Sequence, residues 1–267
     1  LYYIKGGMYS YIEALEKLII EKGGKIQPLT QVSEILFSKN KTVGVVVNEK
    51  KEKADLVICS NDYTNAVTKL IKEPSIKDLI KPVENLKYSC SIFILYLALD
   101  KKYPKLKVHN IFINNNFKKN IQSPFKGFLS PDPSLYIYCP SSIDDSVCPE
   151  NCEIINIVVR VPNLLNGKVT WTSKKVDKMK KHILSILSSI DGLEDIEEHI
   201  IYDTFTTPLD LRDRFDTYGG CAFGLAHSLN ESLLFRPQCY IPKIKNLYFT
   251  GASIHPGNGV SMVLKFF

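Results

Sequence analysis

The sequence predicts a mixed α/β fold with an antiparallel sheet inserted in its middle. Two runs typical of buried strands, ADLVICS at 54–60 and NLYFTGA at 246–252, lie near opposite ends of the chain. Between them, residues 88–160 carry apolar strand runs separated by Pro, Asn and Asp clusters. Helical periodicity at the start of the chain and again after the sheet region completes the α/β pattern.

The first seventy residues predict two helices around a set of short strands. Apolar residues recur at three- and four-residue spacing from Met8 to Ile19, and Gly23-Gly24 is a suitable helix stop. Asp62, after the ADLVICS strand, is expected to cap a helix that runs to Leu70. Additional strands are expected at Lys25–Leu29, Val32–Phe37 and Val43–Val47.

The remaining elements follow in the same way. The expected strands of the antiparallel sheet are SCSIFILYLALD, KVHNIFI, SLYIYCP and EIINIVVRVP. An amphipathic helix is expected at Val176–Leu187 and a strand at Ile196–Phe205, with loops over 207–242.

Composition narrows the functional class. The chain has 267 residues, 45% hydrophobic and 23% charged, as in ordinary globular proteins. Its net charge of +6 is spread over lysines along the whole chain, which argues against nucleic acid as a partner. Seven irregularly spaced cysteines predict free thiols in a cytoplasmic protein and no metal site. The longest apolar run, 90–99, is shorter than the ~20 residues of a membrane-spanning helix.

The candidate site with the strongest sequence signal is GASIHPGNGV at 251–260. A buried strand that meets a Gly-Pro-rich loop and then a helix start offers free backbone N–H groups. These groups suit a phosphate or the electron-rich edge of a flavin ring, and glycine allows a planar ligand to approach the backbone. An ordinary Gly-rich turn is an equally good interpretation of the spacing alone.

The residues themselves favour a flavin. GASIHPGNGV followed by an apolar helix resembles the GAS-x-HPG-x-GV segment of carotenoid desaturases of the bacterial phytoene desaturase type. Cys221–Gln238 resembles the AFGL…RP block of this family, and Lys5–Leu18 resembles its GGM helix. The middle of the chain is most similar to the branch that acts on C30 diapophytoene (dehydrosqualene).

This resemblance implies an FAD-dependent two-domain flavoprotein of the amine oxidase/phytoene desaturase type. Residues 1–85 would form part of the FAD-binding domain, 86–242 an antiparallel-sheet substrate domain, and 243–267 the return to the FAD-binding domain. The GxGxxG that grips the FAD pyrophosphate in this family is missing, and the chain begins with Leu and ends in SMVLKFF. We therefore expect a fragment of a longer protein that is inactive alone.

The resemblance also implies the cofactor-binding residues. Gly251, Ala252 and Ser253 would line the ribityl and pyrophosphate side of FAD. Val32 matches a position whose backbone meets the adenine in related flavoproteins. The residues expected near the isoalloxazine ring are His255, Pro256, Gly257, Gly259, Val260 and Met262. Asn258 and Ser261 replace residues that are often Gly and Pro in the family.

The implied reaction is desaturation of the C30 precursor 4,4'-diapophytoene to diaponeurosporene-like products. The implied partners are an apolar polyene substrate, the membrane surface and, as electron acceptor, quinone or oxygen. We expect a cytoplasmic enzyme that associates peripherally with membranes. The alternatives are a phytoene desaturase, a carotenoid isomerase or oxidase of the same fold, a lipid-surface binding module, and a non-catalytic truncated fragment. No catalytic residue is assigned.

Other residues carry weaker signals. A general-base role for His255 is less favoured than a loop role, and without a GxSxG elbow no hydrolase triad is expected. The run LDLRDRFD at 209–216 is more typical of a solvated ion-pair face than of a substrate clamp. Four tyrosines on apolar strands are expected to lie in the core or to line a substrate tunnel: Tyr88, Tyr96, Tyr136 and Tyr138.

Overall fold

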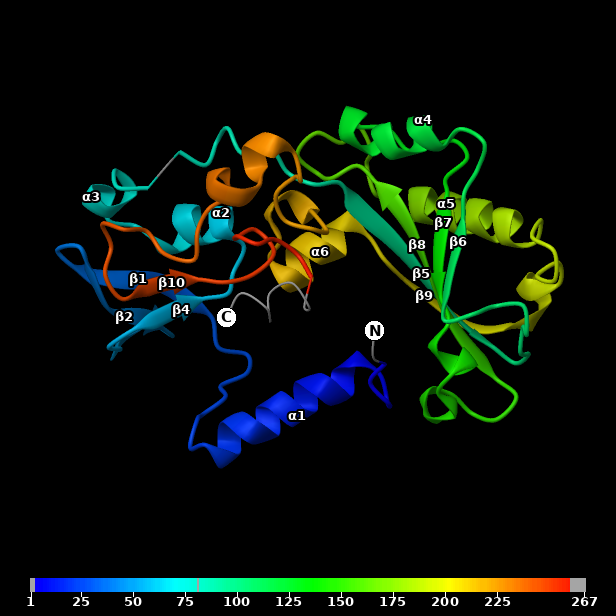
Figure 1. Cartoon of the computed structure of the whole chain (residues 1–267), viewed down its shortest axis with the longest axis horizontal. Helices are drawn as coiled ribbons and strands as arrows, with labels where there is room; N and C mark the ends of the chain where they lie inside the picture. The colour runs from blue at the N-terminus through cyan, green and yellow to red at the C-terminus, as the bar shows by residue number, and fades with distance from the viewer. Residues whose placement is uncertain (1–2, 81, 260–267) are drawn as a thin grey trace. The chain divides into compact units, whose positions relative to one another are not determined.

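The computed structural model describes residues 3–80 and 82–259 and divides the chain into two compact units (Figure 1). The first unit comprises Leu1–Gln27, Ile92–Pro162 and Asn166–Thr207. The second comprises Pro28–Ser91, Asn163–Leu165 and Pro208–Phe267. These groups differ from the expected division, since 1–27 joins the antiparallel sheet while 86–91, 163–165 and 208–242 join the other unit. The assignment of cofactor and substrate to the two units stays a prediction.

The first unit is built on a five-stranded sheet in the order β6-β7-β8-β5-β9. Antiparallel pairs include His109 with Tyr138 and Ile94 with Thr206. The expected antiparallel sheet is therefore present. Its strands are β5 (Ser91–Leu99), β6 (His109–Phe112), β7 (Leu135–Tyr138), β8 (Glu153–Val161) and β9 (Ile200–Thr206).

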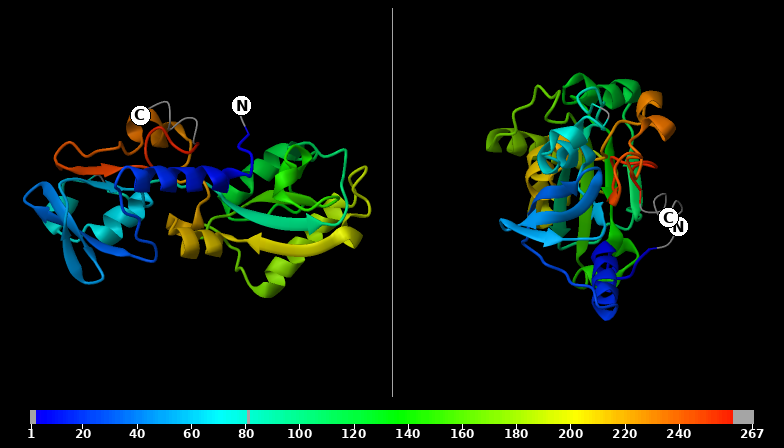
Figure 2. Two further views of the ribbon diagram at one scale, coloured as in Figure 1. Left: turned by 90° about the horizontal axis from the view of Figure 1, so that it is seen from below. Right: turned by 90° about the vertical axis from the view of Figure 1, so that its left-hand side faces the viewer.

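One face of this sheet forms the core of the first unit. Along β5 and β8, every second residue is buried and the residues between them are partly exposed, as the two-residue period of a strand requires. The helix α5 (Ser173–Leu187) lies along one face of the sheet and buries Val176, Met179, Ile183 and Leu187 (Figures 1 and 2). The Phe93 and Trp171 rings stack at 5.7 Å between centroids.

The first helix, α1 (Met8–Glu21), matches the expected helix, and Gly23 follows it with φ of +80°. None of its residues is buried, although the period of its apolar residues is that of an amphipathic helix. The Tyr3 hydroxyl and the Gly6 amide, which precede the helix, both donate to the Asp144 carboxylate. These hydrogen bonds attach the start of the chain to the sheet unit.

The second unit contains two small sheets. Strands β1 (Val32–Ser38), β2 (Lys41–Val47) and β3 (Lys50–Lys53) form an antiparallel sheet, and β4 (Val57–Cys59) pairs in parallel with β10 (Leu247–Phe249). The core between them includes Ile35, Cys59, Tyr63, Val67 and Phe249.

Asp62 caps the helix after β4, as expected, because its carboxylate accepts from the Thr64 amide at 3.1 Å. This helix, α2 (Tyr63–Asn65), continues as a π-helical turn, Ala66–Leu70. The other α-helices are α3 (Pro74–Lys77), α4 (Phe117–Gln122) and α6 (Pro208–Phe215). The 3-10 segments are Pro124–Lys126, Pro140–Ser142, Asp145–Val147, Ile196–His199, Tyr218–Gly220, Leu229–Glu231 and Leu233–Phe235.

Some expectations about single elements were wrong. Residues 25–29 form no strand, since the segment is largely exposed, contains Pro28 and has no partner strand. Helix α6 lies in a region expected to be loop. The strand expected from Ile196 begins at Ile200, after a 3-10 turn.

Two global findings concern the residues that the structure describes. Within 3–80 and 82–259, no helix is long and apolar enough to cross a bilayer. In these ranges no disulfide joins any of the seven cysteines, and Cys59, Cys90, Cys139 and Cys221 are buried.

Candidate functional site

The two parallel strands of the second unit end side by side, where the glycine-rich loop begins. Phe249 of β10 pairs with Cys59 of β4, and the Thr250 amide donates to the Cys59 carbonyl at 3.0 Å. The chain leaves these strands as 60–62 and as 251–253. In open α/β sheets, ligands bind beyond the carboxyl ends of parallel strands. These two loops therefore define the candidate site.

A buried side-chain hydrogen bond connects the two loops. The Ser253 hydroxyl donates to Asp62 Oδ2 at 2.6 Å, while Asp62 Oδ1 accepts from the Thr64 amide. Burial raises the pKa of Asp62, and the hydrogen bonds from Ser253 and Thr64 partly oppose this rise. The carboxyl group thus fixes the start of the glycine loop to the start of α2.

Gly224, in the AFGL segment, packs directly against the glycine loop. Its φ is +65°, and a Cβ atom at this position would lie 2.8 Å from the backbone of Ala252 and 2.9 Å from the Ser253 nitrogen. Any side chain would therefore push the two backbones apart. Gly251 itself has φ of +121°, a conformation that L side chains rarely adopt. Both glycines are needed for this loop geometry.

Arg236 holds the glycine loop through hydrogen bonds to its backbone carbonyls. Its side chain is only 2% exposed, and its guanidinium group donates to the backbone carbonyls of three segments. In the glycine loop, Nη2 donates to the Ala252 carbonyl at 2.5 Å and Nε donates to the Ile254 carbonyl at 3.2 Å. The other acceptors are the carbonyls of Leu225, Ala226 and Glu231. Because five carbonyls converge on one side chain, Arg236 fixes this loop to the AFGL segment.

Val32 lies at a separate part of the same unit. It lines a hollow of about 670 Å³ together with residues of β1, β2 and the end of β4. Ser60 lines this hollow too, and its carbonyl would lie 3.6 Å from a Cβ atom built on Gly251. Ser60 therefore lies between the Val32 hollow and the glycine loop. An extended ligand that contacts both would pass Ser60.

The rim of this hollow contains a polar cluster that the sequence did not predict. Asp216 accepts from Asn61 Nδ2 at 3.0 Å, from Asn65 Nδ2 at 3.1 Å and from Lys69 Nζ at 2.7 Å. The expected solvated ion-pair face is seen in the exposed pairs of Asp216 with Lys69 and of Arg212 with Asp213, and Asp216 in addition joins the two asparagines. The sequence feature that could have predicted this cluster is the short polar run SND after the buried strand, which places Asn61 at the strand end.

The structure brings most of the predicted residues together in one loop. Gly251, Ala252, Ser253, His255, Pro256, Gly257 and Gly259 follow β10 directly, and the His255 amide donates to the Pro237 carbonyl at 2.8 Å. Val260 and Met262 lie outside the described residues. The role of each of these residues in cofactor binding stays a prediction. Arg236 was missed, because the run SLLFRP places an arginine beside apolar residues without showing the carbonyls that surround it.

Two buried thiols and one buried phenol lie near the site, and burial keeps all three protonated. Burial raises the pKa of Cys59 and, more strongly, of Cys221, which keeps both thiols protonated. Tyr88 forms a buried hydrogen bond with Thr64, and burial raises its pKa as well. Within the described ranges, no group of three or more His, Cys, Asp or Glu side chains is placed to hold a metal.

Comparison with known proteins identifies the family. The family model of flavin containing amine oxidoreductases matches residues 1–263. A 4,4'-diapophytoene desaturase (4,4'-diaponeurosporene-forming) of Staphylococcus haemolyticus strain JCSC1435 is 35% identical over 99% of this chain. Its counterpart in Staphylococcus aureus strain Newman is 33% identical over the same share. In both cases the chain spans 54% of the relative's length.

Solved structures show the same fold. An oxidoreductase from Methanosarcina mazei matches 97% of this chain and 52% of its own, with a TM-score of 0.56 and 18% identity. A putrescine oxidase variant matches 93% of this chain and 48% of its own, with a TM-score of 0.53 and 10% identity.

Proposed function

The chain belongs to the family of flavin-containing amine oxidoreductases, and we propose that it forms part of an FAD-dependent desaturase of 4,4'-diapophytoene. The product proposed is 4,4'-diaponeurosporene or a similar C30 polyene. The observation that supports this most strongly is the 33% and 35% identity to two 4,4'-diapophytoene desaturases over 99% of the chain. Because the chain spans about half of these relatives, the activity is proposed for the full-length protein.

The residues present fit FAD. The glycine loop lies beyond the carboxyl ends of β4 and β10, and Gly224 and Gly251 leave its backbone without side chains on these sides. Gly251, Ala252 and Ser253 would contact the ribityl and pyrophosphate part, and the Val32 hollow would take the adenosine end. The ring would lie against His255–Gly259. When bound, FAD would accept a hydride from the carbon–carbon bond that is oxidised.

The protein's own contribution is to position these groups. Arg236 and Asp62 both form hydrogen bonds with the glycine loop, so that its backbone is arranged before a ligand binds. Such preorganisation avoids the cost of ordering the loop at the moment of binding. A hydrocarbon offers no charged group to bind, so burial of apolar surface at ~25 cal/mol per Å² supplies its affinity.

The partners of the full-length protein are part of the same proposal. A C30 polyene dissolves in the bilayer, so we propose that the protein takes it up while associated peripherally with the cytoplasmic membrane surface. Quinone or molecular oxygen is proposed as the final electron acceptor. Both assignments depend on the proposed substrate.

The test is pigment formation by the protein expressed from its complete reading frame in cells that make 4,4'-diapophytoene. We expect new visible absorption with fine structure, whose wavelength reports the number of conjugated double bonds. In the same frame, Arg236→Lys should lower flavin absorbance and pigment together while circular dichroism shows that it stays folded, and the matched control Arg212→Met should keep both. Colourless extracts despite soluble, flavin-loaded protein would refute this substrate; phytoene, isomerase and oxidase substrates would then be tried.

A further inference from the structure

We propose that residues 115–131, here called the Phe–Lys loop, form the surface through which this protein binds an anionic lipid bilayer. The loop lies in the first unit between β6 and β7 and contains α4. This inference rests on the membrane association proposed above and adds to it the surface that makes the contact.

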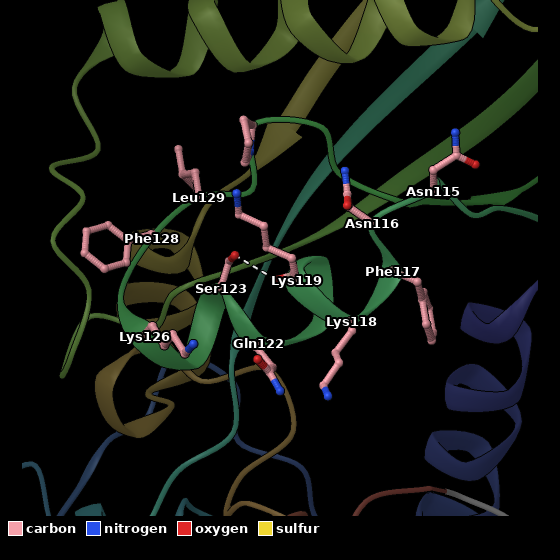
Figure 3. Close-up of a pocket in the computed structure, with 11 residues that line it drawn as sticks. Asn115, Asn116, Phe117, Lys118, Lys119, Gln122, Ser123, Lys126, Phe128 and Leu129 are labelled. Atoms are coloured by element: carbon pink, nitrogen blue, oxygen red, sulfur yellow. Dashed lines mark hydrogen bonds between the residues drawn. The ribbon is translucent and has the colours of Figure 1, made fainter.

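The loop exposes three large aromatic side chains within twelve residues. The exposed fractions are 47% for Phe117, 53% for Phe125 and 50% for Phe128. Scattered single apolar residues on a surface need no explanation, but a group of them marks an interaction site. Phe117 and Phe128 lie at different sides of a hollow of about 800 Å³ that the loop surrounds (Figure 3).

All charged side chains of the Phe–Lys loop are positive. Residues 115–131 include Lys118, Lys119 and Lys126 and no Asp or Glu. All three lysines are exposed and line the same hollow as Phe117 and Phe128 (Figure 3). A fourth lysine, Lys168, lies 4.9 Å from the centroid of the Phe128 ring. Aromatic and basic side chains are therefore interleaved, as in protein surfaces that enter the headgroup region of a bilayer.

Polar side chains hold the loop from the inside. Asn120 is buried, donates to Asn114 Oδ1 and to the Asn116 carbonyl, and accepts from the Ser130 hydroxyl. The Ser123 hydroxyl, also buried, donates to the Lys119 carbonyl at 2.7 Å. The usual arrangement is reversed at these positions, since the Asn120 amide and the Ser123 hydroxyl are buried while the three phenyl rings are exposed.

The backbone of the loop is fixed as well. Gly127 has φ of +84°, and its carbonyl accepts from the Lys168 amide at 3.0 Å. A Cβ atom at this position would lie 2.4 Å from the Asn166 carbonyl oxygen, so the loop packs closely on the 166–168 segment. The phenylalanines are thus exposed by a defined conformation.

An anionic bilayer fits this surface better than a water-soluble protein or nucleic acid does. Its headgroups attract lysines, and the acyl boundary beneath them takes phenyl rings, which gain from leaving water. Each lysine close to an anionic membrane strengthens binding roughly fivefold. Three lysines and three phenyl rings together are enough for reversible peripheral binding.

The experiment is vesicle co-sedimentation of the protein expressed from its complete reading frame. The vesicles contain either phosphatidylcholine alone or phosphatidylcholine with phosphatidylglycerol. We expect binding to the anionic vesicles that decreases with salt. The variants K118Q/K119Q/K126Q and F117S/F125S/F128S should each bind at least ~10-fold more weakly. Circular dichroism checks that both remain folded.

The matched controls remove the same groups elsewhere. K50Q/K51Q/K53Q neutralises three exposed lysines of β3, and F215S removes an exposed phenylalanine of α6. Both should bind vesicles like the wild type. Equal losses in loop and control variants, or no loss in F117S/F125S/F128S, would overturn the proposal. Loss in the lysine variant alone would indicate adsorption to headgroup charge without insertion of the phenyl rings and would also overturn it. Vesicle binding and circular dichroism do not depend on pigment formation. Failure of this proposal is therefore distinguished from failure of the proposed reaction.

Discussion

Replacing the buried Arg236 should lower the free energy of unfolding more than replacing an exposed arginine does. In Arg236→Met the side-chain volume is largely kept, but donors to five backbone carbonyls are lost. A buried acceptor left without a donor costs about 1–3 kcal/mol, and these costs are not additive. We therefore expect the free energy of unfolding to fall by about 3–5 kcal/mol, a large part of a typical total of about 5–15 kcal/mol.

The assay combines urea unfolding, followed by far-UV circular dichroism, with hydrogen exchange. Exchange should increase in peptides that cover 225–226 and 252–254, because these are the carbonyl segments that Arg236 joins. Arg236→Lys keeps the charge and part of the donors, so we expect about half of the loss. This variant gives a result even where Arg236→Met does not fold.

The control is Arg212→Met, which removes an exposed guanidinium group paired only with its neighbour Asp213. An exposed pair of this kind contributes about 0.2–1 kcal/mol. If the Arg212 and Arg236 variants shifted the unfolding midpoint equally, or if exchange in the glycine loop stayed at the wild-type rate, the reasoning about Arg236 would be refuted.

Three further predictions follow from single residues. Gly224→Ala should lower the thermal midpoint more than Gly23→Ala, since both have positive φ but only position 224 places a Cβ atom against backbone at 2.8 Å; equal shifts would contradict this. Hydrogen bonds, of which the one from Ser146 has the largest effect, hold the pKa of Asp144 well below its usual range. The Asp144 carboxylate therefore stabilises the folded state fully above about pH 4, and this contribution declines as the pH falls. Asp144→Asn should therefore destabilise at pH 7 and approach the wild type at pH 2 in urea titrations, and a constant difference would argue against it. Burial raises the pKa of Asp62, so the contribution of Asp62 to stability falls as pH rises above about 4, and the deficit of Asp62→Asn should shrink from pH 4 to 7 in the same assay.

The elements that the sequence predicted well are those whose own residues decide their structure. The apolar alternation of β5 and β8 specifies a strand with one buried face, and Asp62 caps the next helix with its own side chain. By contrast, β3 consists of exposed charged residues and forms because Asn48 and Glu49, both at positive φ, turn the chain back along β2. Helix α6 was missed because its charged run has little apolar periodicity.

The residues of the candidate site likewise fall into those that the sequence could predict and those that it could not. The glycine loop could be predicted, because the glycines and the strand before them are contiguous in sequence. Arg236 and Asp216 could not, since their roles depend on carbonyls and amides that the fold brings from distant segments. A single sequence shows that Arg236 lies in an apolar run, but not which five carbonyls surround it.

The parallel pairing of β4 with β10 has a consequence for biosynthesis. The loops that follow these strands are joined by Ser253 and Asp62, which are 191 residues apart in the chain. At ~5–20 residues per second, the ribosome needs roughly 10–40 s to make the intervening segment. Throughout that time the apolar run ADLVICS lacks its partner strand and is open to association with other nascent chains. Slower initiation or lower expression temperature should therefore raise the yield of folded protein more than stronger promoters do.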